Sequence, residues 1–152
     1  MRPEPLRAFS PKFARCIESV LTKPGKSFIY FNQVKLYGVD FLCQALKENG
    51  LLEYKQPVQK TSICFRCRQS ASHHDMQSRA DHAFQPFYFF RITGEEGSRY
   101  EKALGVFNSP NNNQGQHLQV VVGSQRVLQG FNFLAVNNVY ILSFPFNMPN
   151  MI

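Results

Sequence analysis

The first residues in this sequence whose types suggest chemistry are Gly25, Lys26 and Ser27. They match the end of a phosphate-binding loop, G-x-x-x-x-G-K-[ST], whose glycines let backbone N–H groups surround the phosphates. The first glycine of that motif would fall at position 20, which is Val20, and an apolar run follows where a P-loop would open a helix. The spacing therefore argues against a P-loop, and we predict a turn before a strand.

A second candidate is the polar stretch 55–86, which holds two cysteines and three histidines: Cys64, Cys67, His73, His74 and His82. Two thiolates and two imidazoles can bind zinc, and Cys64, Cys67, His73 and His82 are one such set. A single C-x-x-C is a weak signal, however, and the histidine spacing matches no common zinc finger. The stretch also lacks hydrophobic periodicity, so we favour a long polar insertion or mobile loop, with zinc binding as the alternative.

Composition narrows the class of protein. The 152 residues suit one domain, and we treat 1–152 as a single domain or fragment. The formal net charge is +7, and residues 1–60 carry ten lysines and arginines against five acidic residues. A basic surface suits nucleic-acid phosphates as partners, although lysines that are merely solvated remain the plainer explanation.

Cysteine usage and the chain ends suggest a soluble protein in a reducing compartment. The four cysteines lack the spacing of a disulfide framework, and Cys16 and Cys43 lie among apolar residues like small core side chains. The N-terminus lacks the apolar run of a signal peptide. Polar residues interrupt the uncharged run after Arg126, so we expect no membrane span.

Three helices are predicted from start and stop signals. One runs from Ser10-Pro11 to about residue 22, because Ser can cap and Pro suits the first helical position. Another covers 37–49 and stops at Gly50. The third opens with a capping box formed by Ser98 and Glu101 and ends near residue 108.

Apolar strands alternate with these helices, at 27–31, 51–54, 87–92, 117–124 and 138–144. Their aromatic residues are predicted to lie in the core instead of stacking on bases: Phe28, Tyr30, Phe87, Phe89 and Phe133. Alternation of apolar strands with helices predicts an α/β fold with a mainly parallel sheet. Ligands of such sheets bind at the loops beyond the carboxyl ends of the strands.

The order "GKSFIYF…GVDFLCQALKENG…FYFFRITG…SRYEKALGVFNSP…LQVVVGSQRVLQGFNF…NVYIL" resembles the C-terminal RecA-like lobe of superfamily-2 helicases. Within that superfamily it is most similar to the helicases and transcription-linked ATPases of large cytoplasmic DNA viruses, of the poxvirus and asfarvirus type. The resemblance implies a three-layer domain with helices on both faces of the sheet. It also implies a location in the host cytoplasm, at the viral factory, and packaging in the virion.

The resemblance carries residue roles with it. "SFIYF" matches the first strand of the lobe, so Asn32 and Gln33 would lie near the nucleic-acid backbone. "ITG" and the helix after it place Thr93, Gly94 and Arg99 where backbone contacts or helix docking occur. "GSQRVLQGFN" matches motif V, in which Gly123 and Ser124 would meet a phosphate. A strand-end cap is the plainer role for Ser124.

Three further residues of motif V would face the nucleotide cleft between two lobes: Arg126, Gly130 and Asn132. Asn132 departs from the family, because many members have Asp near the ribose at this place, although an amide can also bond a hydroxyl. Arg126 would face the other lobe or solvent.

The resemblance also implies what this segment does not carry. Walker A and Asp-Glu motifs, which bind ATP and magnesium, belong to an N-terminal RecA-like lobe, and motif VI would follow residue 152. We therefore expect a viral helicase or nucleic-acid-stimulated ATPase in the full-length protein and no ATP hydrolysis by this segment alone. The rival hypothesis is a stand-alone, non-catalytic module that binds nucleic acid or protein on the same fold.

Overall fold

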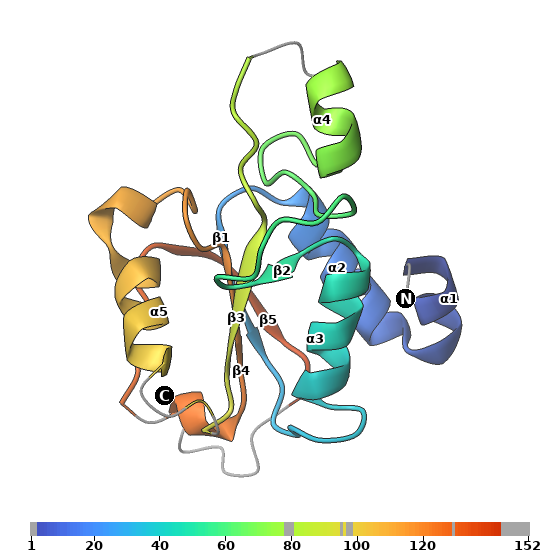
Figure 1. Ribbon diagram of the computed structural model, residues 1–152. Helices are drawn as coiled ribbons and strands as arrows, with labels where there is room; N and C mark the ends of the chain where they lie inside the picture. Colours follow the sequence, from blue (N-terminus) through green and yellow to red (C-terminus); the bar gives the residue numbers. More distant parts are fainter. Residues whose placement is uncertain (1–2, 78–80, 95, 97–98, 129, 144–152) are drawn as a thin grey trace.

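The computed structural model describes residues 3–77, 81–94, 96, 99–128 and 130–143 (Figure 1). Five strands form one sheet in the order β2-β3-β4-β1-β5, and every pairing between them is parallel. The strands are β1 (Lys26–Tyr30), β2 (Leu52–Glu53), β3 (Tyr88–Ile92), β4 (Val120–Gly123) and β5 (Val136–Ile141). The predicted α/β class with a parallel sheet is confirmed.

Helices cover both faces of the sheet and make three layers (Figure 1). Helices α1 (Pro3–Phe9), α2 (Pro11–Thr22) and α3 (Val39–Glu48) contribute to a core on one face, while α5 (Arg99–Asn108) contributes to a core on the other. Two short 3₁₀ helices, η1 (Pro110–Asn112) and η2 (Gln125–Leu128), flank β4. Within the described part of the chain, no helix is both long and apolar enough to span a membrane.

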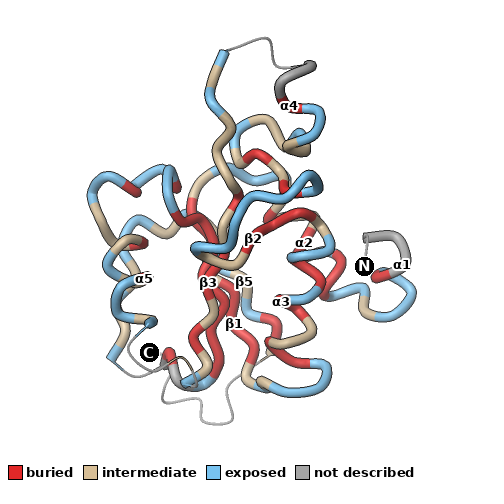
Figure 2. The backbone as a smooth tube through the Cα atoms, in the orientation of Figure 1, coloured by how far each residue is buried: buried red, intermediate tan, exposed pale blue. Residues whose placement is uncertain are grey.

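The buried side chains concentrate on the central strands and the helix faces against them (Figure 2). Tyr30, Phe87 and Phe89 are buried, and Phe28 stacks on Phe133 at a ring distance of 4.8 Å beside the second core, so the five aromatic assignments are confirmed. Cys16 and Cys43 are buried as expected, and burial raises the pKa of each thiol to about 12. Both are therefore uncharged core residues.

Helix boundaries follow most of the expected signals. Ser10 caps α2 by accepting a hydrogen bond from the Phe13 N–H at 3.4 Å, and Pro11 is the first helical residue. Helix α3 begins later than predicted, at Val39, because Gly38 before it has a non-helical backbone with φ −95° and ψ −140°. Helix α1 was not predicted, and Ser98 of the expected capping box lies outside the described residues.

Lys26 is a core residue. A P-loop lysine would instead have to reach a bound phosphate. Gly25 turns with a φ of 84°, and Lys26 then opens β1 with no exposed surface. Its ammonium donates a 2.6 Å hydrogen bond to the Phe107 carbonyl and lies 4.3 Å from the Phe107 ring centroid. Burial lowers the pKa of this lysine. The side chain therefore joins the start of β1 to the end of α5.

The polar insertion at 55–86 contains more regular structure, in the residues described, than its lack of hydrophobic periodicity predicted. Helix α4 (Ala71–Gln77) forms there, and antiparallel bridges join Ile63 to Ser70 and Cys64 to Pro86. Ser62, Cys64 and His74 are buried. Short bridges and one seven-residue helix give too little periodicity for a sequence pattern to reveal, and the hydrogen bonds that stabilise them are tertiary.

Substitution Lys26→Ala should lower the free energy of unfolding by about 2–4 kcal/mol, because a large buried side chain and its hydrogen bond are lost. Urea unfolding followed by circular dichroism measures the change. Lys23→Ala, at an exposed position three residues earlier, is the matched control and should change stability by about 0.5 kcal/mol or less. Equal effects of the two substitutions would contradict a core role for Lys26.

Candidate nucleic-acid interface

The loops after β1, β3 and β4 leave the sheet side by side at its carboxyl edge. Gly123, the last residue of β4, is the register partner of Tyr30 on one side and Ile92 on the other. The Phe31 N–H donates to the Gly123 carbonyl at 3.0 Å, and the Ser124 N–H donates to the Ile92 carbonyl at 3.1 Å. The segments that contain Asn32, Thr93 and Ser124 are therefore brought together, as predicted.

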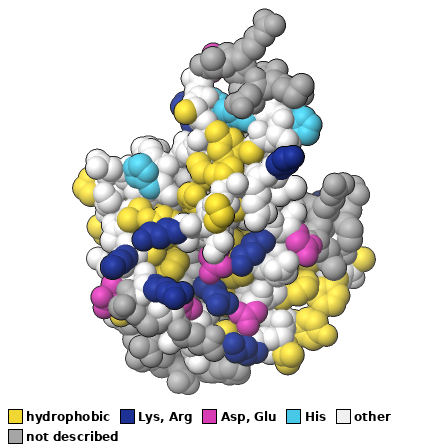
Figure 3. Space-filling view, viewed as in Figure 1, with side chains coloured by type: hydrophobic (Ala, Val, Ile, Leu, Met, Phe, Trp, Pro, Cys, Tyr) yellow, Lys and Arg dark blue, Asp and Glu magenta, His cyan; other side chains and the backbone are white. Residues whose placement is uncertain are grey.

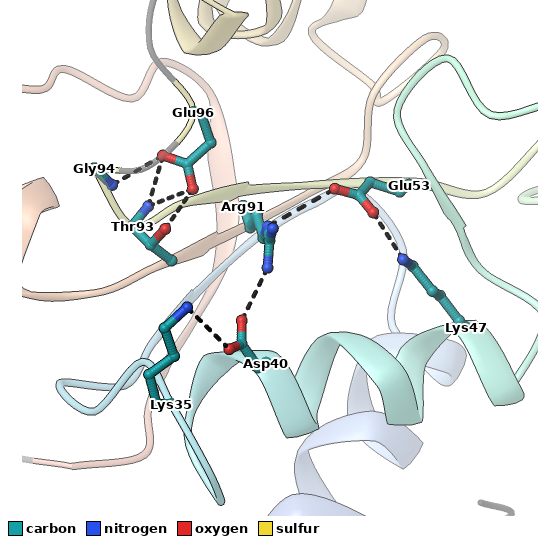
Figure 4. A network of polar contacts seen from close by, with 8 residues as sticks. All are labelled: Lys35, Asp40, Lys47, Glu53, Arg91, Thr93, Gly94 and Glu96. Carbon is teal, nitrogen blue, oxygen red and sulfur yellow. Dashed lines mark hydrogen bonds and ion pairs between the residues drawn. The ribbon is translucent and has the colours of Figure 1, made fainter.

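At the end of β3, backbone N–H groups surround a carboxylate (Figure 4). Thr93 N–H donates to both oxygens of Glu96, at 2.9 and 3.0 Å, and Gly94 N–H donates to one of them at 2.8 Å. Gly94 has a φ of 98°, in the left-handed region that glycine adopts without strain. Such convergent N–H groups form an anion site, and a carboxylate occupies it here.

The pKa of the Glu96 carboxyl shows that this site favours negative charge. Burial acts to raise its pKa, but the hydrogen bonds from Thr93 and Gly94 outweigh burial and leave the pKa below its ordinary value. Sequence reasoning selected Thr93 and Gly94 but missed Glu96. The signal available was an acidic residue within three positions of a strand-end glycine, which is common in turns and therefore weak.

Arg99 lines a cleft of about 570 Å³ next to this anion site. Three other basic residues share the cleft: Lys55, Arg91 and Lys102. Figure 3 shows a group of Lys and Arg side chains, with acidic ones among them, on this face of the molecule. Lys102 follows Arg99 by three positions on α5, which places both on one helix face, whereas Lys55 comes from the chain after β2.

Ion pairs hold one wall of this cleft in place (Figure 4). Arg91 on β3 donates to Asp40 on α3 at 2.8 Å and lies 3.8 Å from Glu53 on β2. Glu53 in turn pairs with Lys47 at 2.7 Å. The network links α3 to β2 and β3, so the Arg91 charge is shared with acidic neighbours, whereas Arg99 and Lys102 are exposed.

The segment after β4 is tightly constrained. A Cβ at Gly123 would meet the Val127 side chain at 2.6 Å, so only glycine fits between β4 and η2. Ser124 is buried at 2 % exposure, and its carbonyl accepts the Val127 N–H at 3.0 Å. This backbone bond opens η2, and the phosphate contact expected of Ser124 stays a prediction. Arg126 lies in η2, with its side chain outside the described residues.

The loop after β1 is closed by the end of β5. The Asn32 N–H donates to the Ser143 hydroxyl at 2.8 Å, and that hydroxyl donates back to the Asn32 amide oxygen at 3.1 Å. Gln33 is exposed, and its carbonyl accepts the Val39 N–H. Of the two predicted residues, Gln33 is therefore the one whose side chain faces solvent.

Asn132 does not lie with Ser124. Its carbonyl accepts a 2.7 Å hydrogen bond from Asn108, the last residue of α5, and Asn108 also accepts the Leu134 N–H at 2.8 Å. Helix α5 begins beyond the carboxyl end of β3, and its ten residues span about 15 Å. Asn132 thus lies toward the amino edge of the sheet, while Gly130 is exposed with a φ of 79°.

The cysteines and histidines of the insertion form a cluster with a different histidine from the one predicted. Ligand atoms of Cys64, Cys67, His74 and His82 all lie within 4.8 Å of one another. His73, the predicted member, instead contacts the hydroxyls of Ser70 and Ser72 through Nδ1, at 2.8 and 3.1 Å. Burial acts to raise the Cys64 pKa, but hydrogen bonds from the backbone of Cys67, Gln85 and Arg66 lower it overall.

The fold and the convergent strand-end loops define a RecA-like, three-layer α/β domain. No protein-family model matches the chain. It is 33% identical, over 153 residues, to an early transcription factor large subunit homolog of African swine fever virus, and this match covers 97% of the chain but 13% of that protein.

Two further relatives come from other large DNA viruses. A putative ATP-dependent RNA helicase of Acanthamoeba polyphaga mimivirus is 27% identical over 94% of the chain and 14% of its own length. An early transcription factor 70 kDa subunit of Melanoplus sanguinipes entomopoxvirus is 24% identical over 90% of the chain and 20% of its own length. The similarity to helicase-type proteins of large DNA viruses is therefore confirmed, over a segment that spans a small part of each relative.

Substitution Glu96→Gln should destabilise the protein at neutral pH and much less in acid. Because the folded-state pKa of Glu96 is depressed, its contribution is present above the unfolded-state pKa and is lost as pH falls through the folded value. Urea unfolding of both proteins at pH 7 and at about pH 3, on either side of the ordinary glutamate pKa, tests this.

Glu101→Gln, at an exposed position in the first turn of α5, is the control. A destabilisation by Glu96→Gln that is the same at both pH values would rule out a charge-dependent role for this carboxylate.

Proposed function

We propose that this chain is the second motor lobe of a viral ATP-dependent helicase or nucleic-acid-stimulated ATPase, with a role in transcription. The carrying observation is the anion site at the end of β3 beside the basic cleft, at the edge where strands β1, β3 and β4 end together. The similarity to viral early transcription factor subunits and to a putative helicase supports the same class.

In this proposal the nucleic-acid strand lies along the carboxyl edge. The N–H groups of Thr93 and Gly94 would bind one phosphate after Glu96 withdraws, because a phosphate and a carboxylate both accept such hydrogen bonds. Arg99 and Lys102 would neutralise neighbouring phosphates, and Gln33 would reach the backbone from the loop after β1. Contacts of this type provide affinity and orientation without reading the base sequence.

The motor role requires a second lobe. ATP and magnesium would bind mainly to an N-terminal RecA-like lobe of the same full-length protein, and the segment around Arg126 and Gly130 would face that nucleotide. Closure of the two lobes around ATP would shift the strand relative to this edge, which couples hydrolysis to movement. The full-length protein would then act in the host cytoplasm at the site of viral transcription, and packaging into the virion would fit an early role.

The rival function is a stand-alone module that binds nucleic acid without catalysis. Its supporting observation is that the anion site and the basic cleft lie wholly within this chain. The two functions predict different effects of a substitution in η2, which does not line the basic cleft. A motor lobe would lose ATP turnover, whereas a stand-alone binding module has no ATP turnover to lose.

The double substitution Arg99→Ala with Lys102→Ala should weaken binding of the full-length protein to a single-stranded oligonucleotide. Each lost phosphate contact should also reduce the slope of log K against log salt by about 0.7. Fluorescence anisotropy across a salt series measures both. The control is Arg15→Ala with Lys23→Ala, which removes the same charges from exposed positions on and beside α2. An equal loss in both proteins would attribute binding to net charge alone.

Substitution Arg126→Ala in the full-length protein should reduce nucleic-acid-stimulated ATP turnover by about 10-fold or more, because an arginine that faces the nucleotide stabilises transition-state charge. Steady-state ATPase assays with saturating nucleic acid measure it. Arg15→Ala is the control and should leave turnover unchanged. Unaltered turnover in Arg126→Ala, with binding intact, would support the non-catalytic module.

A further inference from the structure

The insertion between β2 and β3 projects from the amino edge of the sheet, at the end opposite to the proposed nucleic-acid interface (Figure 1). Two cysteines and two histidines of this insertion have their ligand atoms within 4.8 Å of one another: Cys64, Cys67, His74 and His82. Cys64 is fully buried, His74 is 4 % exposed, and Cys67 and His82 are partly buried. These groups contact one another, since Cys64 Sγ and His74 Nε2 both lie within hydrogen-bond distance of His82 Nε2, and one ion placed between the four ligand atoms could bind them all.

Two of the distances between these ligand atoms match the edges of a metal-centred tetrahedron. The Cys64 Sγ lies 3.5 Å from His82 Nε2, and the His74 and His82 Nε2 atoms lie 3.3 Å apart. Zinc bonds of about 2.3 Å to sulfur and about 2.0–2.1 Å to nitrogen give tetrahedral S···N and N···N edges of about 3.5 and 3.4 Å. Two Nε2 atoms aimed at each other can share only one proton, whereas one metal ion accepts both lone pairs.

We propose that Cys64, Cys67, His74 and His82 bind one structural zinc ion with the spacing C-x2-C-x6-H-x7-H. Two thiolates balance the charge of the ion, so the site is neutral and suits its partly buried position. All four positions are filled by protein side chains, which is typical of structural sites and leaves no ligand position open for catalysis. Thiolate and imidazole donors favour zinc over magnesium or calcium.

The surroundings support the ligands. The Gln85 N–H lies 3.5 Å from the Cys64 Sγ and donates to it, which stabilises a thiolate. Arg68, directly after the C-x-x-C turn, donates to the Leu21 carbonyl at 2.6 Å. Its guanidinium also lies 4.5 Å from the centroid of the Phe87 ring. The turn is therefore attached to the body of the domain, and a metal ion would join α4 and the segment before β3 to it.

A zinc ion would add stability to an insertion that has few apolar residues. Two antiparallel bridges and the packing of Ile63 and Phe65 against the core attach its first part, and a structural zinc ion would add folding free energy to these contacts. The ion would act as the cross-link that hydrophobic packing provides elsewhere in the domain.

Zinc content separates this site from a cluster held by hydrogen bonds alone. The protein, purified without added metal and dialysed against metal-free buffer, should retain one equivalent of zinc per chain by mass spectrometry of the metal. Cys67→Ser and His82→Ala should lower zinc affinity by more than about 100-fold. His73→Ala is the matched control, since its ring lies next in sequence to His74 but outside the cluster, and it should retain the full equivalent.

X-ray absorption at the zinc edge should give two sulfur and two nitrogen neighbours, and this measurement on the wild-type protein does not depend on any variant that fails to fold. A metal-free wild-type protein would overturn the proposal, as would a disulfide between Cys64 and Cys67 in the protein as purified. Loss of zinc from His73→Ala, with His74→Ala still loaded, would overturn the ligand assignment.

Discussion

The central position of β4 constrains the rest of this structure. It pairs in parallel with β1 on one side and β3 on the other, and Val120, Val121 and Val122 are almost fully buried. Parallel neighbours cannot be joined by tight hairpins, so the chain must cross over a face of the sheet between them. Those crossovers supply the covering helices, and they make every strand end at the same edge. The edge at which we propose a nucleic-acid interface is therefore set by the strand topology.

The two edges of the sheet differ in their chemistry. At the carboxyl edge, backbone N–H groups at Thr93 and Gly94 point outward beside basic side chains, which favours anions. At the amino edge, the insertion gathers thiols and imidazoles, which favour a soft or borderline metal ion. Separation of the two sites lets the insertion be stabilised without altering the surface that the proposed function uses.

Polar side chains connect elements that hydrophobic packing alone would leave poorly oriented. Lys26 joins β1 to the end of α5, and Asn108 holds the chain between Asn132 and Leu134 before β5. Asn112 donates to the carbonyls of Phe107 and Leu118 and accepts the N–H groups of His117 and Leu118. Buried groups bonded in this way fix direction and register, because a shifted segment would leave them unsatisfied. Lys26, the lysine of the apparent phosphate-binding motif, is a core residue of this kind, because its ammonium is bonded to the Phe107 carbonyl.

The sequence by itself determined the α/β class, the parallel sheet, the core aromatic residues and the absence of a P-loop, because these depend on local periodicity and spacing. It also selected Thr93 and Gly94, whose strand-end position follows from the order of elements. Only the tertiary structure showed that Glu96 occupies their N–H groups and that Asn132 lies away from Ser124, since both facts depend on how distant segments pack. Likewise, the sequence could not show that His74, and not His73, joins the cysteine cluster. That depends on which face of α4 is turned toward the cysteines and on the position of His82 in the fold. Neighbouring histidines are equivalent in the sequence but point in different directions on a helix.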